Sequence, residues 1–163
     1  MVEKLLKHSE QHNEYREHAL LFLMAYAFLL RVPSEGIPVV AGGSDSAPSL
    51  TKEGEKSLVL RLPRRKNKPM GSRLVRGCWC KESAATCPLH VLGPWFANTP
   101  AGSRLFPNVT PTSALATLRG MLKDLEVENA RLYRTHDFRR GHAKDLQLAG
   151  EFLIYAQIDH YES

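Results

Sequence analysis

An unbroken apolar run, Ala19–Leu30, constrains the fold of this chain more than any other feature. The run is too short to cross a bilayer and begins too late for a secretory signal, so it belongs in a protein core. We expect one buried helix from about Ser9 to Leu30 that ends before Pro33, with residues 34–36 in the following turn. Arg31 would then lie where this buried helix emerges.

Composition indicates a single soluble domain. The chain has 163 residues, of which 43% are hydrophobic and 24% are charged, enough for one core but not for a second full domain. We therefore expect one domain over residues 1–163. Three cysteines, an odd number without an export signal, argue against a disulfide framework and for a reducing compartment. A secreted or membrane protein is not expected.

A β-hairpin is predicted in the middle of the chain. Residues 41–56 have the composition of a loop, and Ser57–Leu62 then alternates like a strand. A second strand, Ser72–Arg76, follows the turn-forming residues 68–71. The fold class expected is α+β and mainly helical, with this small antiparallel hairpin carrying a very basic tip.

The second half of the chain is predicted to be helical. The helices expected are Cys87–Asn98, with an interruption at Gly93 and Pro94, then Ser113–Val127 and His136–Ala149, with a loop over 99–110. Thr110 or Thr112 would cap the second helix, and Thr135 would cap the third. Gly150 would end the third helix, and Glu151–Tyr161 is apolar enough to pack.

Positive charge is clustered in two segments. The net charge is +5, and much of the excess lies in Arg61–Lys68 and Arg131–Arg140. Clustered basic charge favours a polyanionic partner, with nucleic acid first. The alternative is a basic protein whose charges are merely solvated.

The segment Thr135–Gly141 contains a His-x-x-Arg pattern. His136 and Arg139 are three residues apart at a helix start, so their side chains lean toward one face. Cleavage of a phosphodiester requires a cation that stabilises charge on the phosphate oxygens and a nearby group that can transfer a proton at neutral pH. The pattern therefore predicts a phosphate site, and a solvated helix start is the alternative.

Three thiols and an imidazole occur close together at Cys78, Cys80, Cys87 and His90. They form a ligand set suited to structural zinc, and Cys-x-x-His at a helix start is a common half-site. Such a zinc would pin the loop after the hairpin and would have no open position for hydrolysis. Buried free cysteines beside a capping histidine are the alternative.

The order of these features resembles that in the catalytic domain of the tyrosine recombinases. The amino-acid sequences of the individual segments resemble the fungal, Crypton-type branch of that family. The likeness covers nearly the whole chain. It is carried by the segments Phe28–Glu35, Arg64–Lys68, Cys87–His90, Thr135–Gly141 and Phe152–Tyr155.

The resemblance implies DNA cleavage and rejoining, hence DNA recombination and integration. By this resemblance Tyr155 attacks a DNA phosphate and forms a 3′-phosphotyrosyl link, so that catalysis requires no cofactor. Arg31 and Arg139 would grip the transition state, since guanidinium forks match phosphate oxygens. His136 would help manage the tyrosine proton. Lys66, slightly favoured over Lys68, would protonate the leaving oxygen.

The resemblance also implies supporting residues and partners. Glu35 would lie behind Arg31 and support its side chain without contacting the phosphate itself. The partner would be double-stranded DNA, with homo-oligomers on the DNA and residence in the nucleus. The DNA contacts would include Arg64, Arg65, Lys68 and Arg140.

Two departures from the family favour a rival interpretation. The interval from His136 to Tyr155 is short, as if a segment between residues 150 and 152 were deleted, and an N-terminal core-binding domain is not expected. The alternative function is therefore an inactive DNA-binding remnant of a mobile element. The non-catalytic alternatives are that Arg31 is a charge at a helix end, that Tyr155 is a packed aromatic residue, and that the hairpin lysines only contact phosphates.

Overall fold

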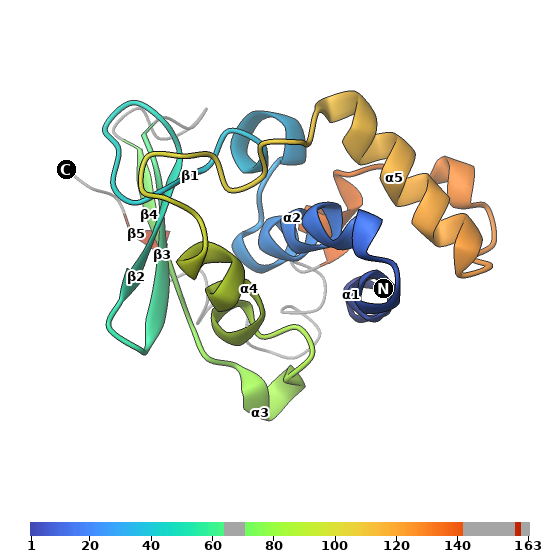
Figure 1. Cartoon of the computed structure of the whole chain (residues 1–163), viewed down its shortest axis with the longest axis horizontal. Helices are drawn as coiled ribbons and strands as arrows, with labels where there is room; N and C mark the ends of the chain where they lie inside the picture. The colour runs from blue at the N-terminus through green and yellow to red at the C-terminus, as the bar shows by residue number, and fades with distance from the viewer. Residues whose placement is uncertain (64–70, 142–158, 161–163) are drawn as a thin grey trace.

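The apolar run forms the centre of the molecule. A computed structural model describes residues 1–63, 71–141 and 159–160. Within it, helix α2 (Arg16–Phe28) is buried on almost every side, and side chains such as Phe22 and Leu23 are fully shielded from solvent. The expectation of a buried helix is confirmed (Figure 1).

The expected single helix from Ser9 to Leu30 is wrong at its start. Helix α1 (Val2–Gln11) precedes α2, and a short 3₁₀ turn, Asn13–Tyr15, separates them. The residues that α1 buries are Val2, Leu5, Leu6 and Ser9. Their spacing is that of one helical face, which the many polar residues of this segment concealed.

Among the described residues, five strands form one sheet in the order β1-β2-β3-β4-β5. They are β1 (Val40–Ala41), β2 (Ser49–Glu53), β3 (Ser57–Leu62), β4 (Ser72–Gly77) and β5 (Asp159–His160). Only β1 and β2 are parallel in this order, and the other neighbours are antiparallel. The α+β fold class is confirmed, as is the β3–β4 hairpin, in which Leu60 lies opposite Leu74.

The prediction of a loop over residues 41–56 is wrong in part. Strand β2 lies inside that range and pairs with β3, so that Thr51 faces Val59. Its sequence, Ser-Leu-Thr-Lys-Glu, buries only its first two residues and therefore lacks the apolar alternation of a half-buried strand. Backbone pairing with β3 decides its structure.

The remaining helices follow the predicted order with shifted bounds. Between residues 80 and 124 they are α3 (Cys80–Ser83), α4 (Pro88–Ala97) and α5 (Pro111–Asp124). The expected interruption at Gly93 and Pro94 is wrong, because α4 runs through both residues. Thr110, rather than Thr112, caps α5, since its side chain accepts the backbone N–H of Ser113. Helix α5 also ends before the expected Val127.

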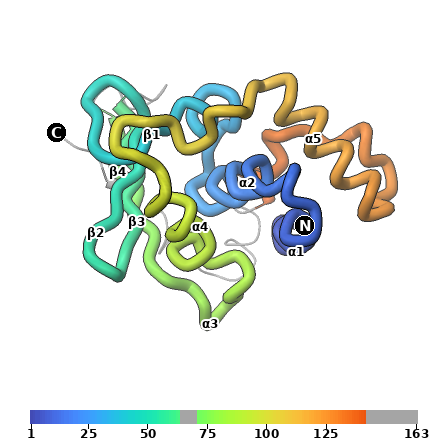
Figure 2. The backbone as a smooth tube through the Cα atoms, in the orientation of Figure 1, coloured from blue at the N-terminus to red at the C-terminus, as the bar shows by residue number. Residues whose placement is uncertain are grey.

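A buried arginine joins the sheet to the central helix. Arg76 of β4 is 2% exposed, and its Nε donates to the carbonyl oxygen of Ala27 at 2.8 Å. The same guanidinium lies over the ring of Phe28, 5.4 Å from its centroid. A cation at a helix C-terminus satisfies carbonyls that have no intrahelical partner. This hydrogen bond joins the hairpin to the last turn of α2. Figure 2 shows β2, β3 and β4 gathered on one side of α2.

Gly71, at the start of the hairpin's second strand, is expected to tolerate no side chain. Its φ is +87°, and a Cβ there would clash with the Leu62 carbonyl oxygen and lie 2.7 Å from that of Pro63. Gly71→Ala should therefore cost about 3 kcal/mol of stability in chemical denaturation. Gly54→Ala is the matched control, because its φ is also positive but its Cβ would meet open space. Equal losses for both variants would contradict the clash.

Candidate functional site

Three sulfurs and one ring nitrogen converge beside α4. The Nδ1 atom of His90 lies 3.5 Å from the Cys78 sulfur, 3.2 Å from that of Cys80 and 3.4 Å from that of Cys87. The ligand atoms of all four residues lie within 4.8 Å of one another. The four residues thus form a group that could hold a metal such as zinc.

The separations of the sulfurs from the His90 nitrogen match a tetrahedral zinc site. Zinc binds sulfur at about 2.3 Å and imidazole nitrogen at about 2.0–2.1 Å, which places sulfur and nitrogen about 3.6 Å apart at tetrahedral angles. The three observed separations fall within 0.4 Å of that value. The ligand set is also closed, because four protein atoms leave no position for a reacting water.

The local backbone arranges the four ligands on short elements. Cys78 follows β4, Cys80 begins α3, Cys87 precedes α4, and His90 lies in the first turn of α4. Between the first two ligands, Trp79 turns the chain so that its side chain is buried and its Nε1 donates to the Thr86 carbonyl.

Backbone donors already point at two of the sulfurs. The N–H of Trp79 donates to the Cys87 sulfur, and the N–H of Cys80 donates to the Cys78 sulfur, both at 3.4 Å. Hydrogen bonds from Cys80 lower the pKa of the Cys78 thiol, whereas the side-chain hydrogen bond with Cys78 raises the pKa of Cys80 to about 12. The thiolate, the form that binds metal, is thereby favoured at Cys78, and Cys80 would release its proton on binding.

A second site brings together two members of the predicted catalytic pattern. Arg31 and His136 are far apart in sequence but line one cavity of about 440 Å³. The remaining lining residues are Val32, Pro33, Ser34, Pro111, Leu115, Arg134 and Thr135. The cavity therefore combines cations with an apolar wall.

Unusual backbone geometry presents Arg31 to this cavity. Helix α2 ends at Leu29, which adopts the left-handed conformation with φ 59°, a strained choice for a residue with a side chain. A π-helix, Val32–Gly36, begins directly after Arg31. Glu35 accepts the backbone N–H of Arg31 at 2.9 Å. Strained backbone and π-helical turns occur often at functional sites.

His136 directly precedes helical residues 137–141. The side chain of Asp137 closes the turn before these helical residues, because its Oδ2 accepts the backbone N–H of Arg134 at 2.9 Å. This hydrogen bond takes the place of the cap that was predicted for Thr135. Burial lowers the pKa of His136, and the nearby Arg140 and Arg139 lower it further. The imidazole is therefore neutral at pH 7 and able to accept a proton.

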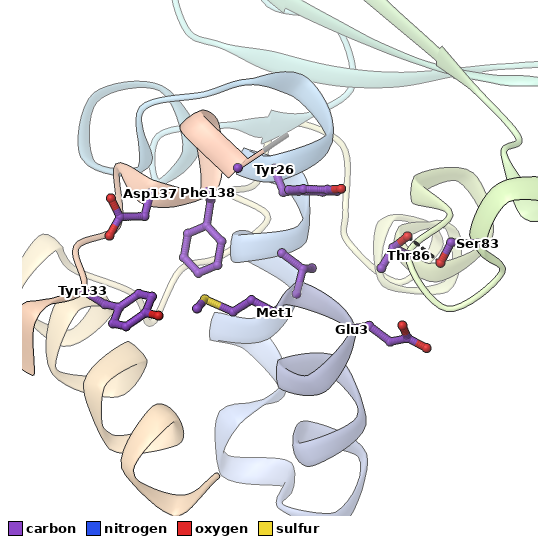
Figure 3. Close-up of a pocket in the computed structure, with 10 residues that line it drawn as sticks. Met1, Glu3, Tyr26, Ser83, Thr86, Tyr133, Asp137 and Phe138 are labelled. Carbon is purple, nitrogen blue, oxygen red and sulfur yellow. Dashed lines mark hydrogen bonds between the residues drawn. The ribbon is translucent and has the colours of Figure 1, made fainter. Parts of the chain in front are cut away.

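Phe138 anchors this helix to the core. Its side chain is 3% exposed and stacks on Phe22 of α2, with the ring centroids 4.7 Å apart. Figure 3 shows its ring beside Met1, Tyr26 and Tyr133, at a second cavity of about 430 Å³. The side chain thus determines where the neighbouring His136 lies.

Phe138→Leu is expected to lower stability and to change the surroundings of His136. The loss of ring stacking should cost about 1 kcal/mol and allow the helix to shift, moving His136 away from Arg31. Thermal unfolding and NMR titration of the His136 imidazole, measured together, test this. Phe96→Leu, at a half-buried ring of α4, should lower stability alone. A His136 pKa that is the same in both variants would contradict a positioning role.

Several predicted site residues lie outside the described part of the chain. They are Arg64, Arg65, Lys66, Lys68 and Tyr155. Arg139 and Arg140 are described, and both contribute to the electropositive surroundings of His136. Sequence reasoning missed Pro111 and Leu115 as cavity residues. It also missed Arg134, although this arginine lies within the basic cluster Arg131–Arg140.

Comparison of the chain with protein-family models, curated proteins and solved structures found no match. Within the described residues, no helix combines the length and the apolar character that a membrane crossing requires.

Proposed function

We propose that this chain is a DNA-binding domain of the tyrosine recombinase type, which cleaves and rejoins DNA through a phosphotyrosyl intermediate. The observation that supports this proposal is the cavity shared by Arg31 and His136. Arg31 follows a buried helix, and His136 begins a helix near the C-terminus, as the order of residues in that family requires. Arg139, three residues later, contributes to the same electropositive region.

The chemistry assigns each group a separate task. The Tyr155 oxygen attacks the phosphorus, the bond to the 5′-oxygen breaks, and a phosphotyrosyl ester forms. The guanidiniums of Arg31 and Arg139 stabilise the charge that develops on the non-bridging oxygens. Neutral His136 can accept the tyrosine proton, and Lys66 supplies the proton that the leaving oxygen takes up.

Covalent trapping tests the catalytic proposal. A nicked suicide substrate, which releases a short strand after cleavage, should accumulate a denaturation-resistant protein–DNA adduct with the parent chain. Tyr155→Phe should form no adduct but retain DNA affinity. If the parent chain also forms none while its binding remains salt-sensitive, the chain is the alternative, a DNA-binding remnant without catalytic turnover.

We propose further that the ligand set Cys78, Cys80, Cys87 and His90 holds one structural zinc ion. The sulfur–nitrogen separations and the amide donors to sulfur favour this function. Cobalt, which replaces zinc in such sites, should give one equivalent of a visible absorption band typical of tetrahedral thiolate ligands. His90→Ala should weaken that band, whereas His12→Ala, at another exposed histidine, should not. Without stoichiometric binding, the cysteines are ordinary free thiols.

A further inference from the structure

The cavity between Arg31 and His136 has a composition that a phosphate alone does not explain. Its cationic members are Arg31 and Arg134, and His136 adds a neutral imidazole to the same wall. Its other wall is formed largely by Val32, Pro33, Pro111 and Leu115. The volume, about 440 Å³, lies within the range of roughly 300–1,000 Å³ that small-molecule sites occupy.

A phosphate contact on duplex DNA needs only exposed cations on a surface. It leaves an adjoining apolar cavity unused. A ligand that joins a phosphate to a flat, largely apolar group would use both walls at once. The nucleotide is the unit of DNA with that construction.

We infer that the cavity accepts one unpaired nucleotide of a bound DNA strand. Its phosphate would lie at Arg31 and His136, and its base would lie against Pro33 and Leu115. This inference rests on the proposed function, because the strand is delivered by the DNA that the domain binds. A paired base cannot enter, since it is stacked and hydrogen-bonded within the duplex.

The charges around the cavity suit this ligand. Arg139 and Arg140 act on the His136 imidazole strongly enough to lower its pKa, so positive potential extends across this end of the site. Arg31 and Arg134 add two charged groups to the lining itself. Glu35, the acid nearest to Arg31 in the chain, has one carboxylate oxygen engaged by the backbone N–H of Arg31.

The site is expected to prefer DNA with an unpaired nucleotide. The comparison uses an intact duplex and the same duplex with a one-nucleotide flap, whose base is a fluorescent adenine analogue. We expect at least tenfold tighter binding of the flapped duplex, together with a change in the analogue's fluorescence. The free nucleoside monophosphate should compete far more weakly than the flapped DNA.

A matched pair of substitutions locates the effect. Leu115→Trp fills the cavity and should remove the preference for flapped DNA. Ala116→Trp places the same ring at the next, exposed position of α5 and should retain that preference. Circular dichroism establishes that both variants fold. If Leu115→Trp does not fold, Leu115→Phe takes its place.

Each contrary outcome has a distinct meaning. Equal affinity for flapped and intact duplex, or a preference unchanged by filling the cavity, overturns the inference while the proposed duplex binding stands. Equally strong competition by the free nucleotide overturns it in favour of a small-molecule site. Absence of binding to either DNA defeats the inference and the proposed function together.

Discussion

Cys87→Ser is expected to unfold much of the chain at room temperature. Apparent zinc-binding free energies in small zinc domains reach about 10 kcal/mol or more, comparable with the roughly 5–15 kcal/mol that stabilises a whole domain. Cys87 is fully buried at the start of α4 and donates one of the four ligands. Its loss would open the cage and separate α4 from the end of β4.

Thermal and denaturant unfolding, each followed with and without a chelator, measure this effect. The parent chain should become markedly less stable when the chelator is added, and Cys87→Ser should no longer respond to it. Ala114→Ser is the matched control, because it also places a hydroxyl in the core but lies away from the cage in α5. If both variants lose the same stability and the chelator has no effect, the structural zinc proposal is wrong.

Arg31→Gln is expected to damage both DNA binding and cleavage. The loss of one phosphate contact should weaken affinity about tenfold and reduce the slope of log affinity against log salt by about 1. Removal of a group that stabilises transition-state charge commonly costs about 10²–10³ in rate. Adduct formation should therefore fall further than binding does.

Lys123→Gln is the charge-matched control. Lys123 is exposed near the C-terminal end of α5, about three turns or 18 Å from Pro111 at the cavity. Each variant lowers the net charge by one, so long-range attraction to DNA changes equally. Equal losses of affinity would show that only overall charge matters and would contradict a phosphate site at Arg31.

Much of the fold follows from local patterns, and the exceptions have physical causes. The apolar run could be placed in the core because an unbroken series of apolar side chains is unfavourable in water. The alternation of apolar and polar residues in Ser57–Leu62 predicts a strand there. Helix α1 was missed because it buries only one narrow face, and strand β2 was missed because it buries only its first two residues. Their structure depends on tertiary contacts with α2 and β3.

The two sites differ in how far sequence could predict them. The spacing from Cys78 to His90 already predicts a metal ligand set, because all four residues are close along the chain. The proximity of Arg31 to His136 could be expected only from the resemblance to the tyrosine recombinases, because the two residues are far apart in the sequence. Pro111 and Leu115 had no signal, since they reach the cavity through the packing of α5.

The buried contact of Arg76 with Ala27 has a consequence for the proposed DNA binding. It ties strand β4 to the end of α2, four residues before Arg31. Strand β4 therefore keeps a fixed position relative to Arg31, so that under the proposed function a duplex bound by both would form its second contact at a high effective concentration. Two weak contacts would then add to one tight one, and their combined strength would depend on Arg76, to which the proposal gives no contact with DNA.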